Sequence, residues 1–117
     1  MIRDMTQFLL VCLGGAAGSG ARYAVALAVP HGTLVVNLLG SFAIALVLES
    51  MRASDLRLLL VTGFLGGFTT YSAFNQETLT FARAGEWGSV AGNLVGTVVG
   101  CLVAGWVGVW VARKMGA

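Results

Sequence analysis

The sequence predicts an all-α membrane protein in which residues 1–117 form a single domain of four transmembrane helices. Of the 117 residues, 57% are hydrophobic and only 10% are charged, and the mean hydropathy is +0.87. A soluble domain carries about 25% charged residues, so this chain lacks the polar surface to stay in water. Its length provides for four spans of about 20 residues each and leaves no room for a soluble domain.

The charge and the reactive side chains argue against several classes of function. The net charge of +2 is small and scattered, which speaks against nucleic-acid binding and fits contact with membrane lipid. Cys12 and Cys101 lie in different apolar segments, so we expect no disulfide framework. The only histidine, His31, follows a proline in a short turn, far from either cysteine. We therefore expect neither an enzyme nor a metal site made of side chains.

The first predicted span covers residues 6–29. Gly14 and Gly18 lie four residues apart on one helical face, which allows another helix to approach closely. Arg22 lies within the last two turns, where a long side chain can reach the membrane interface. Its position fits an interfacial anchor and a residue at a pore mouth equally well.

The second predicted span, residues 33–48, carries a polar face. Thr33, Asn37 and Ser41 recur every four residues, so they share one side of the helix. A buried asparagine amide needs partners, because an unmade hydrogen bond costs about 1–3 kcal/mol. The face either binds a neighbouring helix or lines a polar path, and the sequence leaves both open.

The third predicted span, residues 56–81, is expected to be interrupted. The glycine pair 66–67 and the threonine pair 69–70 both weaken a helix, since glycine costs about 1 kcal/mol relative to alanine and threonine offers the backbone competing hydrogen bonds. In hydrocarbon, a loosened backbone and a carboxylate such as Glu77 persist only where they line protein or water. The alternative is a surface loop, and the apolar residues at 79–81 argue against it.

An aromatic stripe follows this interruption. Tyr71, Phe74 and Glu77 are spaced by three and fall on roughly one helical face. Such stripes usually pack in a core. Because this one continues into a carboxylate, it favours a lined path.

The fourth predicted span, residues 89–111, carries two stripes side by side. A ridge of small residues predicts close helix packing; its members are Gly92, Gly96, Gly100, Ala104 and Gly108. A polar ridge lies about 100° further around the helix and consists of Asn93, Thr97 and Cys101. We expect this helix to pack on one side and to line a path on the other.

The charge distribution predicts the orientation. Four spans place both termini and the 49–57 connection on one side, which carries five basic residues against two on the other. The positive-inside rule therefore favours cytoplasmic termini.

Three motifs, in order along nearly the whole chain, resemble those of the Fluc fluoride channels of the CrcB family. They are GG…G…RY in residues 14–23, GTLxVNxxGSF in residues 32–42 and GFxGGFTTxSxFxxE in residues 63–77. The third is highly specific.

The resemblance implies an antiparallel, dual-topology dimer of four-helix subunits, each with a break in helix three. It also implies two fluoride pores and one structural sodium ion (Na+) at the dimer centre, held by main-chain carbonyls that match Gly66 and Thr69. The residues that the resemblance implies for the pore are Thr33, Asn37, Tyr71, Phe74, Glu77, Asn93, Thr97, Cys101 and, at the vestibule, Arg22. We expect Ser41, from the polar face of the second span, to line the pore with them. Tyr71 departs from the family phenylalanine, and the polar ridge of the fourth span departs from the usual tyrosine and serine.

We therefore expect a fluoride-selective channel of the cell inner membrane that exports cytoplasmic fluoride passively and protects against its toxicity. The alternative is a proton-coupled exporter of the small multidrug resistance type, but that class needs a carboxylate in its first helix, and none occurs between Asp4 and Glu49. A non-transporting assembly subunit would leave the polar ridge unexplained. A homodimer of inverted copies requires a weak orientation bias, and the count of five basic residues against two speaks against such a weak bias. The complete set of motifs in this chain nevertheless favours a homodimer over a heterodimer.

Overall fold

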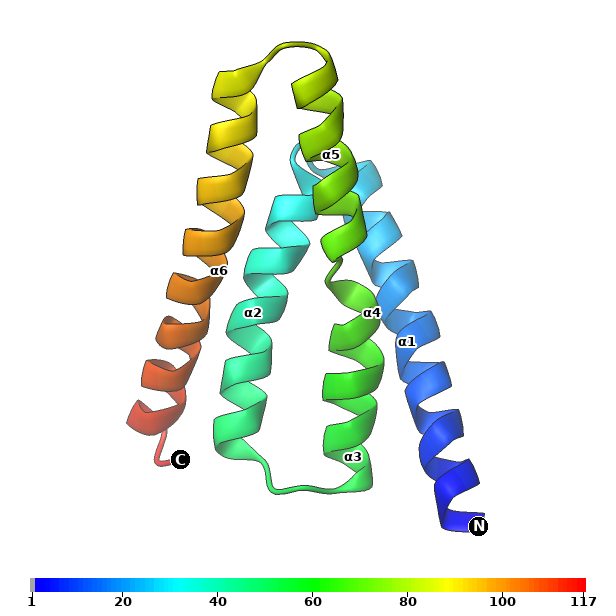
Figure 1. Ribbon diagram of the computed structural model, residues 1–117. Coiled ribbons are helices and arrows are strands. Elements are labelled where there is room, and N and C mark those ends of the chain that lie inside the picture. Colours follow the sequence, from blue (N-terminus) through cyan, green and yellow to red (C-terminus); the bar gives the residue numbers. More distant parts are fainter. Residues whose placement is uncertain (1) are drawn as a thin grey trace.

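The computed structural model describes residues 2–117, which form an antiparallel arrangement of helices (Figure 1). Four helical limbs correspond to the four predicted spans, so the all-helical class is confirmed. The third limb is made of several short pieces. The elements are α1 (Ile2–Ala28), α2 (Gly32–Ser50), α3 (Asp55–Leu58), the π-helical η1 (Leu59–Leu65), α4 (Gly66–Phe68), α5 (Tyr71–Arg83) and α6 (Trp87–Lys114).

Three helices in the described part of the chain are long and apolar enough to cross a membrane. They are Arg3–Ala28, Gly32–Ser50 and Trp87–Lys114. Both termini and the connection between α2 and α3 lie at the same end of the molecule (Figure 1). The chain is therefore a multi-pass membrane protein, and these segments share one side, as the orientation argument requires.

The third limb leaves helical geometry between α4 and α5. Thr69 (φ −88°, ψ 155°) and Thr70 (φ −151°, ψ 121°) are extended. The Thr69 hydroxyl donates to the Leu65 carbonyl over 2.9 Å, and the Thr70 hydroxyl caps α5 by accepting the Ala73 N–H over 3.2 Å. The two threonine hydroxyls thus bond to the backbone before and after the extended residues. The sequence predicts such side-chain bonds, which compete with the backbone bonds of a helix.

Glycines bring α1 against the third limb at backbone contact. A Cβ built on Gly14 would lie 2.9 Å from the Cα of Gly63, and one built on Gly67 would lie 2.5 Å from the carbonyl oxygen of Gly15. A Cβ on Gly18 would collide with the Phe64 carbonyl. The predicted close approach through Gly14 and Gly18 is therefore confirmed, and its partner is the limb that carries the interruption.

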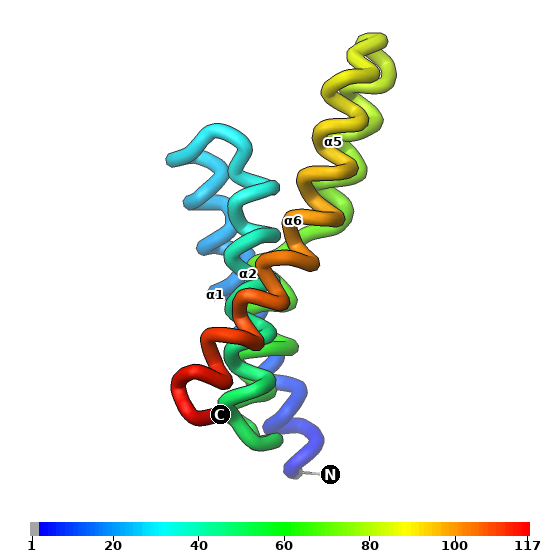
Figure 2. The backbone as a smooth tube through the Cα atoms, turned by 90° about the vertical axis from the view of Figure 1, so that its left-hand side faces the viewer, coloured from blue at the N-terminus to red at the C-terminus, as the bar shows by residue number. Residues whose placement is uncertain are grey.

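The small-residue ridge of α6 packs within the chain along only half of its length. Gly108 lies against the Phe42 carbonyl and Ala45, and a Cβ on Gly100 would lie 3.0 Å from Leu38 Cδ2. A Cβ on Gly92 or Gly96 would have no described atom within 4 Å. In Figure 2, α5 and the first half of α6 run together and lean away from the turn that joins α1 and α2. The prediction that the whole ridge packs is thus met within this chain only at the C-terminal half.

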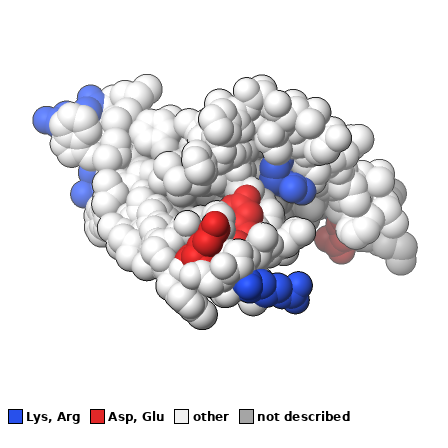
Figure 3. Space-filling model, turned by 90° about the horizontal axis from the view of Figure 1, so that it is seen from above, with Lys and Arg blue, Asp and Glu red and all other residues white. Residues whose placement is uncertain are grey.

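Charged side chains are few on the surface, and seen from above most of the molecule is uncharged (Figure 3). Near the end that holds both termini, Arg113 Nε lies 3.9 Å from Glu49 Oε2. Both side chains are at least one-third exposed, so this ion pair contributes little to stability.

Candidate functional site

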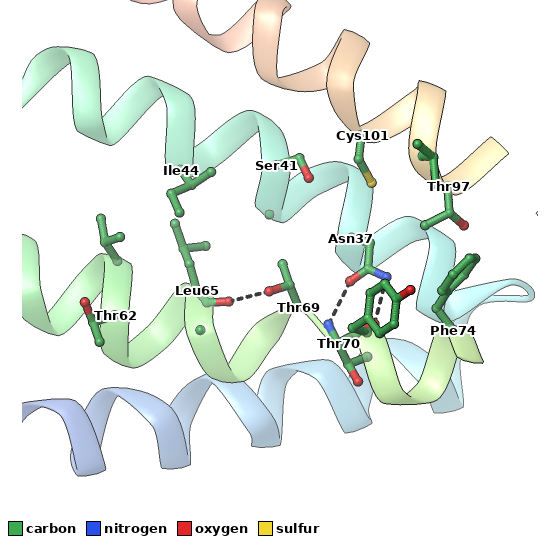
Figure 4. Close-up of a pocket in the computed structure, with 15 residues that line it drawn as sticks. Asn37, Ser41, Ile44, Thr62, Leu65, Thr69, Thr70, Phe74, Thr97 and Cys101 are labelled. Carbon is green, nitrogen blue, oxygen red and sulfur yellow. Dashed lines mark hydrogen bonds between the residues drawn. The ribbon is translucent and has the colours of Figure 1, made fainter. Parts of the chain in front are cut away.

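A partly open cavity of about 640 Å³ lies between α2, α5, α6 and the η1–α4 part of the third limb (Figure 4). It brings together residues from positions 37 to 101 of the chain. Eight of the predicted site residues line it: Asn37, Ser41, Gly66, Thr69, Tyr71, Phe74, Thr97 and Cys101. The other lining residues are Gly40, Ile44, Val61, Thr62, Leu65, Thr70 and Val98.

Asn37 joins α2 to the extended residues of the third limb. Its Nδ2 donates to the Thr70 carbonyl over 3.0 Å, and its Oδ1 accepts the Thr70 N–H over 2.8 Å (Figure 4). The side chain is buried, at 7% exposure. The Asn37 amide therefore bonds both the N–H and the carbonyl of Thr70, which lies outside any helix. Of the two roles that the sequence leaves open for the polar face of α2, Asn37 has the one of binding a neighbouring segment. The amide has two donor hydrogens, and its bond to the Thr70 carbonyl uses one of them.

The two aromatic side chains of α5 meet edge to face at the cavity wall. The ring centroids of Tyr71 and Phe74 lie 5.5 Å apart at an interplanar angle of 61°. Phe74 is buried at 4% exposure, whereas Tyr71 is 79% exposed. Aromatic edges carry partial positive charge, so the buried ring offers an anion an uncharged, weakly attractive surface.

Hydroxyl and thiol groups surround the same space. Thr97 and Cys101 of α6 lie across from Ser41 of α2, and Thr62 and Thr69 lie on the third limb (Figure 4). The hydroxyl of Thr69 already donates its one hydrogen to the Leu65 carbonyl. The other hydroxyls and the Cys101 thiol combine with the Asn37 amide to give a set of neutral hydrogen-bond donors. Two members of the α6 polar ridge, Thr97 and Cys101, therefore line the same cavity as Asn37 and Ser41 of the α2 polar face.

Four predicted site residues do not line this cavity, namely Arg22, Thr33, Glu77 and Asn93. Arg22 Nε donates to the Gly67 carbonyl over 3.1 Å, so the guanidinium lies at the carbonyl end of α4. Asn93 Nδ2 donates to Thr78 Oγ1 over 3.0 Å, which links α6 to α5. Thr33 and Glu77 are half-buried.

The interruption also removes the helical partner of one main-chain carbonyl, that of Gly66. In a continuous helix the Gly66 carbonyl would accept the N–H of Thr70, but that N–H bonds to Asn37. Within residues 2–117, no group of three or more His, Cys, Asp or Glu could hold a metal. Carbonyl oxygens are ligands that suit a hard cation.

Three residues that the sequence did not single out contribute to the site. Gly40 allows the close approach of α2 to the third limb, because a Cβ there would collide with Thr69 Cγ2. Thr62 lines the cavity, and Thr78 bonds both α5 and α6. Gly40 directly precedes Ser41 and Thr78 follows Phe74 by one turn, but only the positions of neighbouring helices reveal what each contacts.

A multi-pass helical bundle whose helices surround a cavity lined by neutral donors and a buried aromatic ring is a membrane transport protein of the channel type. The chain belongs to the CrcB family: the model described as "CrcB-like protein, Camphor Resistance (CrcB)" matches residues 9–109.

Curated relatives agree with this membership. A relative from Anaeromyxobacter sp. (strain K) is 48% identical over 104 residues, which cover 78% of this chain and 82% of the relative. One from Rhizobium etli is 48% identical, covering 77% of this chain and 81% of the relative, and one from Opitutus terrae is 43% identical, covering 78% and 80%. All three are named "Fluoride-specific ion channel FluC".

Proposed function

We propose that this chain is the subunit of a fluoride-selective channel that lets cytoplasmic fluoride leave the cell passively. The observation that carries the proposal is the character of the cavity: a buried phenylalanine ring, an amide and several hydroxyls, with no charged residue among those that line it. The names of the curated relatives support fluoride as the ion.

The neutral donors account for both dehydration and release. A channel must bind its ion strongly enough for entry and weakly enough for exit. Hydrogen bonds from Asn37 and from Thr97 can replace part of the hydration shell of fluoride, and the edge of Phe74 adds a weak attraction. A lysine or arginine in the same position would bind the anion too tightly for rapid release.

The direction of transport follows from the chemistry of fluoride. Hydrogen fluoride is a weak acid that crosses membranes uncharged and dissociates in the cytoplasm. In the inner membrane the negative-inside potential then drives fluoride outward through a passive pore. Protection against fluoride toxicity is the expected benefit.

An antiparallel homodimer of inverted copies is the proposed assembly. In one chain Tyr71 is 79% exposed, the cavity is partly open, and a Cβ on Gly92 or Gly96 would meet no described atom within 4 Å. A second copy covering this face would close the cavity and bury the aromatic ring. A closed two-fold dimer is the commonest symmetric assembly.

The proposed structural sodium fits the carbonyls at the interruption. Gly66 is exposed and has lost its helical partner, and Thr69 is extended beside it. The carbonyls of Gly66 and Thr69 from each subunit would hold the ion at the dimer centre. A sodium ion held by these carbonyls would supply positive charge that compensates backbone oxygens inside the membrane.

Fluoride efflux should persist without any sodium gradient, because the ion is held as part of the structure and is not carried. We expect equal efflux rates from liposomes with the same sodium concentration on both sides and from liposomes with a tenfold gradient. Radioactive sodium that crosses in proportion to fluoride would contradict a structural role.

Tyr71→Phe should retain most of the efflux, within about two-fold, because the edge-to-face contact with Phe74 needs only the ring. Efflux from liposomes at equal protein content measures this. If efflux disappears while the dimer is intact, the phenol hydroxyl participates in conduction.

The inverted homodimer predicts that both orientations occur in the membrane. The variant Ala117→Cys, with Cys12 and Cys101 replaced by serine, should react with an impermeant thiol reagent on roughly half of its copies in intact cells. Uniform protection from outside would eliminate the homodimer and require an oppositely oriented partner chain.

A proton-coupled exporter of the small multidrug resistance type is the remaining alternative. The only carboxylate in α1 is Asp4, at its start, where a mid-membrane proton carrier is not expected. Liposomes loaded with fluoride distinguish the two: the channel releases fluoride down its own gradient at equal pH on both sides, and an exporter of this type requires a pH gradient.

A further inference from the structure

We propose that Thr78 and Asn93 act together as positioning residues for Phe74, and that Asn93 serves the pore through Thr78. This inference rests on the proposed function, because it assigns residues to a pore formed around Phe74. It begins with a chain of two hydrogen bonds. Asn93 Nδ2 donates to Thr78 Oγ1 over 3.0 Å, and Thr78 Oγ1 donates to the Phe74 carbonyl over 2.8 Å.

The chemistry of this chain fixes what the partner of Thr78 must be. A threonine hydroxyl has one hydrogen to donate, and here that hydrogen goes to the carbonyl one turn earlier. The hydroxyl oxygen can then only accept, so the neighbouring helix has to present a donor. The amide of Asn93 does so, and a carboxylate or an apolar side chain at position 93 could not.

The location of the pair matters because α5 is weakly tied to the rest of its own limb. The extended residues Thr69 and Thr70 separate α5 from α4, so the helical hydrogen-bond ladder does not continue across them. Asn37 holds Thr70 on the α2 side. The Asn93–Thr78 pair holds the next part of α5 on the α6 side.

Phe74 lies midway between these two attachments. Thr70 is the extended residue that caps the start of α5, four residues before Phe74. Thr78 follows Phe74 by four residues, about one helical turn, so these two lie on the same side of α5. One amide from α2 and one from α6 thus fix the rotation of α5 about its axis. Since the ring edge must face the ion path, this rotation determines how Phe74 presents its edge.

The test compares variants that differ in the hydroxyl of Thr78. Thr78→Val keeps the shape and removes the hydroxyl, and we expect fluoride efflux to fall about five-fold, as the loss of one hydrogen bond between neutral groups would give. Thr78→Ser should retain parental efflux. Asn93→Leu should resemble Thr78→Val, and the double variant should be no slower than the slower single variant.

Thr80 provides a matched control on the same helix. Its hydroxyl donates to the Gln76 carbonyl over 2.9 Å, which is the same local bond, but Thr80 is exposed. Thr80→Val should therefore leave efflux unchanged. An equal loss in Thr80→Val would overturn the proposal, because the effect would then come from the local helix bond and not from the link to α6.

A readout that does not depend on conduction separates this inference from the proposed function. A fluorinated phenylalanine placed at position 74 of the detergent-purified protein reports the ring environment by ¹⁹F NMR. We expect Thr78→Val and Asn93→Leu to shift or broaden this resonance and Thr78→Ser to leave it in place. An unmoved resonance in Thr78→Val would overturn the positioning role, whereas absence of fluoride efflux from the parent protein would instead overturn the channel assignment.

Discussion

Phe74→Ile is expected to abolish most fluoride efflux while the dimer still assembles. Isoleucine retains much of the bulk at a position that is only 4% exposed, but it has no electropositive ring edge. An aromatic contact contributes about 0.5–1.5 kcal/mol beyond its buried area, so we expect efflux to fall about ten-fold if one such contact stabilises the ion on its path. Electrode-monitored efflux from liposomes, at matched protein content, measures the loss.

Phe81→Ile is the control for this variant. Phe81 lies on the same helix and is half-buried, but it does not line the cavity. Its replacement by the same residue should leave efflux at the parental rate. Parental efflux from Phe74→Ile would refute the pore role of the ring.

Asn37→Asp is expected to impair both assembly and efflux. The carboxylate can still accept the Thr70 N–H, but its second oxygen would face the Thr70 carbonyl, to which Nδ2 now donates over 3.0 Å. Two acceptors would then oppose each other in a buried site, at a cost of about 1–3 kcal/mol or more for a charged group. The added negative charge would also repel fluoride from the cavity. We expect at least a ten-fold lower efflux and a lower midpoint of thermal unfolding in detergent.

Asn75→Asp separates the effect of charge from the effect of the lost hydrogen bond. Asn75 is exposed on α5 and does not line the cavity, so the same substitution there adds a charge without removing the bond to Thr70. This variant should assemble and conduct at nearly the parental rate. Equal behaviour of the two variants would contradict the role of Asn37 at the interruption.

The four helical limbs could be predicted because each depends on a continuous run of apolar residues. Family membership could be predicted because short motifs can be recognised directly in the sequence. A span requires about 20 apolar residues in a row, and the polar connections between such runs are visible directly. The third limb was expected to loosen at glycines and threonines, and the chain is extended at Thr69 and Thr70. The four-residue spacing of Thr97 and Cys101 likewise determined that both face one side of α6, and they line one cavity.

The hydrogen-bond partners of the polar residues were decided only by the tertiary structure. Asn37 binds Thr70, 33 residues away, and Arg22 binds Gly67, 45 residues away. Asn93 shares the spacing of Thr97, yet it bonds to Thr78 on α5 and does not line the cavity. Helical periodicity fixes the face on which a side chain lies, but the helix opposite that face depends on how the limbs pack. For the same reason the ridge of α6 packs against α2 at Gly108 and lies open at Gly92.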